Sequence, residues 1–457
     1  MTSLKDFLSH LEERTAPVCA FLDGRLYPLL VAIFVVIGHG TGLEFYFNIP
    51  IMLSAYFALL FSRSIKPFIP ILLTIIYQIN YTHAFSDYYL SGAVFVILIV
   101  MVSLLALCFI YFFVRNILPS INFKSPLMLP LIIFSAAVLL GGAFTDEWVI
   151  KNLFYGILQI FAYVLVFYTL YYGLKNEDTS ELISYITYVV TIAGLTVFSE
   201  LLVLYLTSDR LIVDGTVIKE EVHLGWGMWN PIGFILTVTI PLAMRGAMRG
   251  KYKTAYLIAA ILLWGGAILS MSRNAMLFST LTMAVCIVIG AIASERRLLF
   301  RILLGIGIVG AVGICVLLWD KLPGLLSKFL NDNGRYDLWK AAIENFLSAP
   351  VFGRGFYGFG MGNVFAAFLP WLAHNTLLEM LSAAGILGFS AYVFYRVKTL
   401  VPLFRRRPSF DMLMLYLPIF VTLGMSLIDN YVFHIYTTFT YSVCLALIFK
   451  LDGERRS

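Results

Sequence analysis

A histidine stands where a polar segment of the sequence runs into a strongly apolar one. It is His374, in the stretch LPWLAHNTLLEMLSAAGILG that covers residues 369–388. Thr376 and Glu379 have the spacing of a capping box, which predicts that a helix begins there and gives Glu379 a structural role. The helix dipole and nearby arginines favour a neutral imidazole, which can accept a proton. His374 is therefore a candidate general base, although a histidine in such a position is more often only an interfacial polar residue.

Three arginines are candidates to hold an anion. Arg273 lies between two apolar stretches, Arg335 at the start of an amphipathic stretch, and Arg354 in the glycine-rich run GRGFYGFGMG. Guanidinium groups stay charged and bind phosphate oxygens in pairs, so together they could hold a pyrophosphate without a metal. The simpler alternatives are an Arg273 that extends to lipid phosphates and a solvated Arg354. The glycines of the run permit the close approach of a ligand, and they equally suit a flexible loop.

The composition indicates what must position these residues. The chain has 457 residues, of which 60% are hydrophobic and 13% are charged, whereas soluble domains carry about 25% charged residues. Apolar runs long enough to cross about 30 Å of hydrocarbon recur along nearly the whole chain. Alternating strands of about ten residues are absent from the sequence, so helices are expected to cross the membrane. We therefore predict an all-α polytopic membrane protein.

The apolar runs predict about 12–14 transmembrane helices. The candidate spans lie near residues 26–41, 47–62, 67–82, 93–114, 126–143, 150–172, 181–206, 226–245, 253–271, 274–293, 299–319, 375–396, 411–428 and 431–450. The predicted organisation is a cytoplasmic amphipathic N-terminus over 1–25, transmembrane helices over 26–319, an external catalytic loop over 320–374, C-terminal transmembrane helices over 375–450 and a cytoplasmic tail over 451–457.

Positive charge orients the predicted helices. Lysines and arginines are concentrated in alternate connections, as expected for cytoplasmic loops. This pattern places both termini in the cytoplasm and the long loop outside. It also explains the net charge of +6 without a nucleic-acid partner. The five cysteines lie far apart and lack the spacing of metal ligands, and the N-terminus lacks the pattern of a cleaved signal peptide.

The long external loop contains an amphipathic segment. In YDLWKAAIENFLS, residues 336–348, apolar side chains recur at helical spacing, and Pro350 follows. A loop of this length is usually functional or disordered, and a packed helix argues against disorder. We therefore expect a helix that lies at the membrane surface, after Arg335 and before Arg354.

Three motifs in the C-terminal part resemble those of the bacterial O-antigen ligase family. His374 and Asn375, followed after nine residues by Gly385 and after two more by Gly388, resemble its H-N-x9-G-x-x-G motif. The segment SRNAML, which contains Arg273, is similar to the family's R-x3-L motif. The segment GRYDLWKAAIENFLSAPVFGRGF is similar to R-x3-W followed by P-x-x-G-x-G. The motifs stand in the family's order, but the candidate spans exceed the twelve usual for the ligases, so the subfamily stays open.

The resemblance implies a fold, a reaction and a site. The fold would be GT-C-like, with one long external loop that contains an amphipathic helix. The reaction would be an inverting glycosyl transfer from an undecaprenyl-pyrophosphate-linked glycan to a hydroxyl of a glycan or glycolipid acceptor, at the outer face of the bacterial cytoplasmic membrane. The loop has no Asp-x-Asp pair, so neither a metal nor another cofactor is expected. The implied site residues are the base His374, the pyrophosphate-binding Arg273, Arg335 and Arg354, and the supporting Asn375, Gly385 and Gly388.

Three other functions fit parts of the pattern. A polymerase of the same superfamily would join lipid-linked repeat units, with the same leaving group and a different acceptor. A flippase or transporter of lipid-linked oligosaccharides would fit the many spans, but transporters often show two homologous halves, and the sequence shows no repeat. A peptidoglycan polymerase of the shape, elongation and division family would need an acidic catalytic residue that has no clear counterpart. We favour glycosyl transfer, and a ligase over a polymerase by a small margin.

Overall fold

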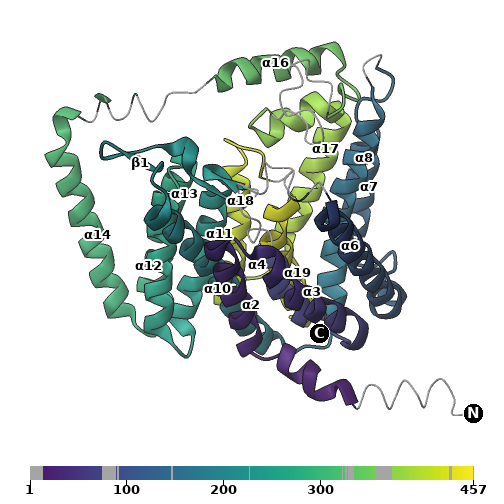
Figure 1. Ribbon diagram of the computed structural model, residues 1–457. Helices are drawn as coiled ribbons and strands as arrows, with labels where there is room; N and C mark the ends of the chain where they lie inside the picture. The colour runs from purple at the N-terminus through teal and green to yellow at the C-terminus, as the bar shows by residue number, and fades with distance from the viewer. Residues whose placement is uncertain are drawn as a thin grey trace, which may run out of the picture. The chain divides into compact units, whose positions relative to one another are not determined.

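The computed structural model describes residues 14–74, 89, 92–145, 148–225, 227–321, 323–324, 327, 334–356, 373–431 and 435–455, without the side chains of 435–437. Helices make up most of this part of the chain, and its strands form two short hairpins (Figure 1). Eight of the described helices are long and apolar enough to cross a membrane, or nine if the bent pair Arg14–Leu22 and Leu26–Thr41 forms one span. The chain is an all-α polytopic membrane protein.

The predicted spans correspond to helices. Each predicted range holds a helix, but of the range 67–82 only the short helix α4 (Ile69–Thr74) and the residues before it are described. Three of these helices are apolar but shorter than a full span: α7 (Met128–Leu139), α12 (Lys253–Leu269) and α18 (Phe410–Met425). The amphipathic segment of the long loop also forms a helix, α16 (Arg335–Ser348). The orientation of the helices in the membrane stays a prediction.

Two compact units make up the chain, and the first comprises residues 1–121, 168–272 and 453–457. Within it α11 is buried along nearly its whole length and packs on α10 and α12. Short 3-10 or π-helical turns lie at Lys66–Phe68, Phe113–Ile117, Leu118–Ser120 and Lys219–Glu221. The other elements of this unit are α2 (Leu26–Thr41), α3 (Glu44–Phe61), α6 (Gly92–Phe112), α10 (Thr179–Thr207) and α11 (Trp229–Arg249), with the antiparallel pairs β1 (Ile212–Val213) with β2 (Thr216–Val217) and β3 (His223–Leu224) with β4 (Gly227–Met228).

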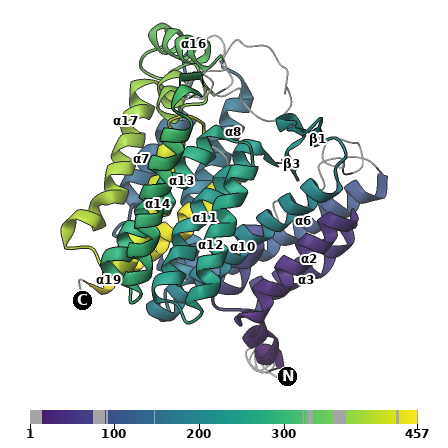
Figure 2. The same ribbon diagram turned by 90° about the vertical axis from the view of Figure 1, so that its left-hand side faces the viewer.

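The second unit comprises residues 122–167 and 273–452 and contains every predicted site residue. Its central helix, α17 (Thr376–Arg405), packs on both α7 and α16, and α7 in turn packs on α8 (Figure 2). Besides α7, α16, α17 and α18, the unit holds α8 (Ile150–Ile160), the π-helical turn Phe161–Leu165, the start of α9 (Val166–Gly173), α13 (Arg273–Ala293), α14 (Arg297–Leu317), the 3-10 turn Trp319–Lys321 and nearly all of α19 (Ile435–Glu454).

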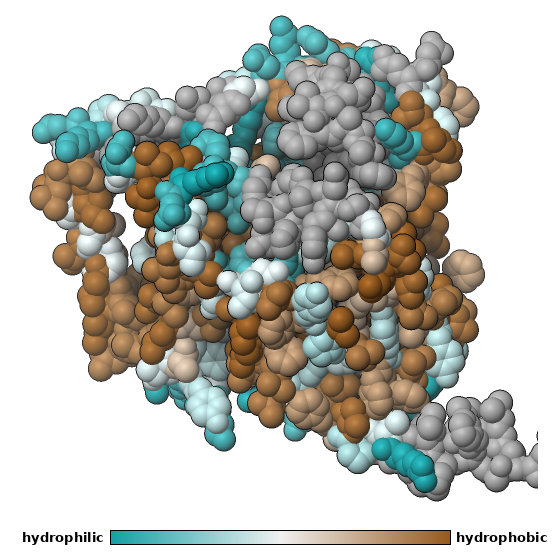
Figure 3. Space-filling view, in the orientation of Figure 1, coloured by the Kyte–Doolittle hydropathy of each residue, from teal (hydrophilic) through white to brown (hydrophobic). Residues whose placement is uncertain are grey.

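Helix α14 pairs with α13 but leaves most of its own surface uncovered. The two helices meet where Phe300 of α14 packs against Gly290 of α13. Beyond this contact almost none of α14 is buried, and its visible face is apolar (Figure 3). An exposed apolar helix of this length in a polytopic membrane protein is suited to contact with lipid.

Helix α17 is broken at its tenth residue, Gly385, which has φ 64° and ψ −163°. The segment 350–355, which follows α16, supplies the missing backbone partners. Before the break, the carbonyl oxygens of Ser382 and Ala383 accept hydrogen bonds from the N–H groups of Arg354 (2.8 Å) and Gly355 (2.9 Å). After the break, the N–H groups of Ile386 and Leu387 donate to the carbonyl oxygens of Pro350 (2.9 Å) and Val351 (3.4 Å). Unpaired backbone groups inside a membrane cost several kcal/mol each, so this pairing is what permits the break.

Two glycines allow this segment and α17 to touch backbone to backbone. A Cβ atom on Gly385 would lie 2.3 Å from the carbonyl oxygen of Val351, and one on Gly353 would lie 2.4 Å from the carbonyl carbon of Ala383. Both glycines also have positive φ, which other residues rarely adopt. The sequence therefore specifies the broken helix and its partner segment together.

Candidate functional site

The start of α17 is capped by Asn375. Its Oδ1 accepts hydrogen bonds from the backbone N–H groups of Leu377 and Leu378, at 3.0 and 3.2 Å. The predicted capping box, with Thr376 as the cap, is therefore wrong by one residue, since Thr376 is already helical. The physical reason is that asparagine caps a helix at least as well as threonine does, and here it serves two donors at once.

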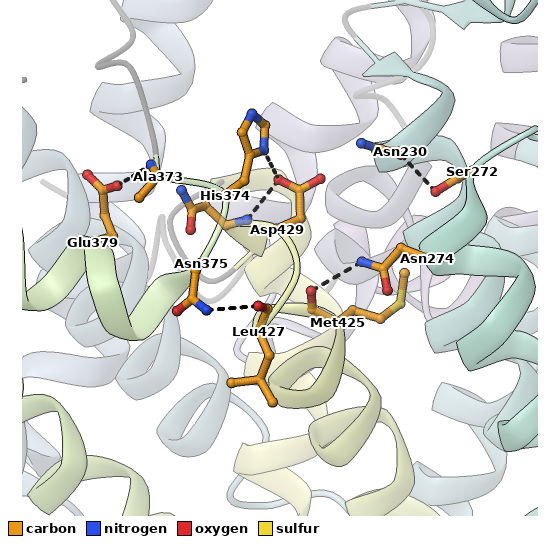
Figure 4. A network of polar contacts seen from close by, with 11 residues as sticks. Asn230, Ser272, Asn274, Ala373, His374, Asn375, Glu379, Met425, Leu427 and Asp429 are labelled. Atoms are coloured by element: carbon orange, nitrogen blue, oxygen red, sulfur yellow. Dashed lines mark hydrogen bonds and ion pairs between the residues drawn. The ribbon is translucent and has the colours of Figure 1, made fainter. Parts of the chain in front are cut away.

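His374 lies directly before this cap and is held against a carboxylate (Figure 4). Its Nδ1 is 2.8 Å from Oδ1 of Asp429, in the turn after α18. Since an ionised carboxylate only accepts hydrogen bonds, Nδ1 carries the proton and Nε2 is left as an acceptor. The Asp429 side chain is 8% exposed and the His374 side chain 41% exposed. The carboxylate is therefore enclosed, while the imidazole can meet a substrate.

The backbone at His374 is strained. Its φ of 50° lies in the left-handed region, which residues other than glycine seldom adopt. Such a conformation costs about 1–3 kcal/mol and persists only where its surroundings enforce it. Directly before it, the buried N–H of Ala373 donates to Oε2 of Glu379 over 2.7 Å. Glu379 does have a structural role, as expected, but it binds a residue two positions before the cap.

Charged neighbours set the basicity of His374. Burial lowers the pKa of the imidazole, but the hydrogen bond and the charge of Asp429 raise it by more. Arg335 opposes this increase, Glu379 adds to it, and the net pKa lies above the ordinary value. Arg335 favours the neutral form, as expected, but the expected net direction is wrong because it did not include Asp429, which raises the pKa by more. The pair makes His374 a stronger proton acceptor.

The last residue of α18 and the turn after it tie the starts of two helices together (Figure 4). The side-chain amide of Asn375 donates to the carbonyl oxygen of Leu427 at 2.9 Å, and that of Asn274 donates to the carbonyl oxygen of Met425 at 3.2 Å. Arg273 is the first residue of α13, directly before Asn274. The structure therefore places Arg273 at the same end of the second unit as His374.

Arg335 also belongs to this end of the unit. It is the first residue of α16 and lies close enough to His374 to lower the pKa of the imidazole. Helix α16 packs across the start of α17, where the buried Ala342 and Ala373 lie against Leu378. A cation at a helix N-terminus is opposed by the helix dipole, so the helix alone does not explain Arg335.

Arg354 is held by its backbone and by its side chain. Its N–H pairs with the break in α17, and its Nη1 donates to Oδ1 of Asn345 in α16 at 3.1 Å. A Cβ atom on Gly355 would lie 2.6 Å from the side chain of Asn152. Gly353 and Gly355 therefore allow other parts of the protein's own chain, rather than a ligand, to approach closely. The rest of the glycine-rich run, from residue 357 onward, lies outside the described residues.

The remaining motif glycines shape α17. Gly385 forms the break, and a Cβ atom on Gly388 would lie 2.2 Å from the Cβ of Ala384. Gly385 therefore serves contact with residues 350–355, and Gly388 serves close packing within α17.

Asp429 is a site residue that the sequence analysis missed. It stands with Asn430 between two apolar runs, in MSLIDNYVF. An ionisable residue in such surroundings is a functional candidate in a membrane protein, so a signal was present. Its partner could not be identified in this way, because 55 residues separate Asp429 from His374.

The arrangement combines a proton acceptor with cations. His374 is oriented, half-exposed and made more basic by Asp429, while Arg273 and Arg335 lie at the same end of the unit. Within the described residues, no group of three or more His, Cys, Asp and Glu side chains could hold a metal ion. Such a set can take a proton from a hydroxyl and stabilise an anionic leaving group.

Comparison with known sequences relates this site to a family. No curated protein matches the chain. A family model described as O-antigen ligase matches residues 258–393, a segment that includes Arg273, Arg335, Arg354 and His374 but ends before Asp429. Through this segment, the chain is similar to the O-antigen ligase family.

Proposed function

We propose that this protein is an O-antigen ligase-like glycosyltransferase. It transfers a glycan from an undecaprenyl-pyrophosphate-linked donor to a hydroxyl of a glycan or glycolipid acceptor. The reaction takes place at the outer face of the bacterial cytoplasmic membrane, with both termini of the protein in the cytoplasm. The observation that carries the proposal is the pair of His374 and Asp429 at the end of the second unit that also holds Arg273 and Arg335.

In the proposed reaction, Nε2 of His374 takes the proton of the acceptor hydroxyl while the acceptor oxygen attacks the anomeric carbon of the donor sugar. The bond between that carbon and the pyrophosphate oxygen breaks, and undecaprenyl pyrophosphate leaves with the electron pair. Attack opposite the leaving group inverts the anomeric configuration. Asp429 holds the imidazole by Nδ1 and stabilises the imidazolium that forms.

The arginines act on the leaving group. Arg273, Arg335 and Arg354 bind the pyrophosphate and stabilise the negative charge that builds on it as the bond breaks. The backbone and the guanidinium of Arg354 are both held by hydrogen bonds before the anion binds. Binding the anion therefore costs little additional conformational entropy. Because guanidinium groups supply the positive charge, the reaction needs no divalent metal.

We place transfer of one glycan to a separate acceptor ahead of polymerisation by a small margin, and the family model that matches is compatible with both. A polymerase would use the same leaving group and the same base. A flippase would need neither, because it moves its cargo without breaking a bond. The proton acceptor held by Asp429 therefore supports transfer chemistry over transport.

The decisive experiment uses the purified full-length protein in lipid nanodiscs. A lipid-pyrophosphate oligosaccharide is supplied with candidate glycan and glycolipid acceptors, with and without EDTA, and products are followed by mass spectrometry. We expect a glycosylated acceptor and free undecaprenyl pyrophosphate in equal amounts, unaffected by EDTA. Loss of product on chelation would contradict the metal-free mechanism. In sealed proteoliposomes, movement of the donor across the bilayer without bond cleavage would overturn the transferase in favour of a transporter.

The same assay separates a ligase from a polymerase. Donor alone is the test condition, with no second acceptor present. A ligase is expected to give no ladder of longer lipid-linked chains, whereas a polymerase would produce one.

A further inference from the structure

A second carboxylate besides Asp429 acts on the segment that carries His374. Glu379, one turn inside α17, reaches back out of the helix and accepts the N–H of Ala373. We propose that Glu379 is a positioning residue for His374, which holds the strained backbone before the helix so that the imidazole stays against Asp429. This inference rests on the proposed function, in which His374 is the base.

The geometry gives Glu379 this role because the helix does not need it. Asn375 already caps the first N–H groups of α17, so Glu379 is free to serve a donor outside the helix. The bond to Ala373 is 2.7 Å long and joins residues that are 1% and 0% exposed. The bond is therefore shielded from bulk water, and a buried N–H without a partner is strongly disfavoured.

The position of this bond in the chain links it to the strain. Ala373 directly precedes His374, whose φ of 50° must be enforced by its surroundings. The side chains of His374 and Asn375 are held by their hydrogen bonds to Asp429 and to the carbonyl oxygen of Leu427. The backbone directly before His374 is held by the hydrogen bond from Ala373 to Glu379. Without that bond the segment can relax, and the imidazole loses its fixed direction.

Glu379 has a second, separable effect through its charge. Among the described residues, the charged groups that act on the imidazole are Asp429 from the turn after α18, Arg335 from α16 and Glu379 from α17. Glu379 raises the pKa of His374, as Asp429 does, and Arg335 lowers it. Substitutions at Glu379 can therefore separate position from charge. Glutamine keeps an oxygen that can accept the N–H and removes the charge, whereas alanine removes both.

The experiment compares Glu379→Gln with Glu379→Ala in the full-length protein. The first readout is kcat/KM against pH with a lipid-pyrophosphate oligosaccharide donor. The second is the rate of His374 modification by diethyl pyrocarbonate against pH, followed on the peptide by mass spectrometry, because only the neutral imidazole reacts. Glu344→Gln is the matched control, since this glutamate lies on α16 with its side chain 64% exposed. Size-exclusion chromatography and thermal unfolding confirm that each variant is folded.

We expect Glu379→Gln to keep most of the maximal rate and to move both pH midpoints to lower pH, by less than Asp429→Asn does. Glu379→Ala should lower kcat/KM about 10- to 100-fold, the loss expected for a hydrogen bond to a charged group. The control should match the wild type. A wild-type rate and midpoint in Glu379→Ala would overturn the inference, as would a Glu379→Gln variant as impaired as Glu379→Ala. If the wild type transfers no glycan, the proposed function fails, while the diethyl pyrocarbonate midpoints still test Glu379.

Discussion

Two basic side chains of the second unit have very different surroundings. His374, directly before α17, has carboxylates as partners: Asp429 at 2.8 Å and, through the backbone of Ala373, Glu379. Arg396, in the far half of α17, is 7% exposed. Its guanidinium carbon lies 4.8–5.5 Å from the ring centres of four tyrosines, Tyr163, Tyr392, Tyr395 and Tyr441.

The difference shows how one helix supports chemistry at one end and rigidity further along. Carboxylates change the proton affinity of a neighbouring imidazole, and the 41% exposure of the His374 side chain lets that proton be exchanged. Aromatic faces attract a guanidinium without altering its charge near neutral pH, and they exclude water from it. We therefore propose proton transfer at the His374 end of α17 and a packing role for Arg396.

The largest effect is expected at the carboxylate-held end. His374→Ala should lower kcat/KM for glycan transfer about 10²- to 10⁴-fold, because a general base contributes that much to the rate. Initial rates with a lipid-pyrophosphate donor measure this. A folded His374→Ala protein with wild-type activity would show that His374 is not the general base.

Gly385 lies between the two regions, and its replacement should damage both. Gly385→Ala places a Cβ atom 2.3 Å from the carbonyl oxygen of Val351 at a positive φ, which should cost about 3 kcal/mol or more. We expect a lower melting temperature and a lower yield in membranes. Gly307→Ala is the control on α14, where a Cβ atom would meet nothing within 4 Å. Equal stability of the two variants would show that the break does not need glycine.

Removing the charge beside His374 should change the pH dependence as well as the rate. The pKa of His374 is raised mainly through Asp429, so the active neutral form is lost as the pH falls through this raised value. Asp429→Asn should lower the pKa and move the acidic limb of the kcat/KM profile to lower pH. The maximal rate should fall about 10- to 100-fold, because the imidazole is held less firmly. An acidic limb that stays in place would show that His374 is not the titrating base.

The smallest effect on activity is expected at the aromatic-held end. Arg396→Lys replaces a flat cation with a compact ammonium that stacks poorly on the tyrosines. It should cost about 1–2 kcal/mol of stability, seen as a lower melting temperature, and leave the pH profile of kcat/KM unchanged. A shifted pH profile of kcat/KM would show that Arg396 influences the proton transfer, and the two regions would then no longer differ in function.

Much of the fold was predictable because local patterns determine it. Long apolar runs gave the helices, and helical spacing of apolar side chains gave α16. The arginines and His374 were proposed as site residues from residue type and spacing, and they lie within the segment that the family model matches. What these predictions share is that each depends on residues close together in the sequence.

The features that were missed depend on contacts between distant segments. Asp429 becomes meaningful only when the turn after α18 meets the start of α17. The break at Gly385 is stable only with the backbone of residues 350–355 beside it. The cap at Asn375 was displaced by one residue because two good caps stand side by side, and the contact to Leu427 favours the first. Periodicity and spacing carry no information on such pairs.

The pairing of residues 350–355 with the break in α17 bears on how the protein is made. A helix that enters a bilayer normally brings all its backbone partners with it, whereas α17 lacks partners around Gly385. The missing ones belong to a segment that the ribosome has already delivered, about thirty residues earlier. Insertion of α17 is therefore coupled to docking of that segment. We expect loop substitutions that hinder docking to reduce the amount of protein in the membrane, before any effect on catalysis can be seen.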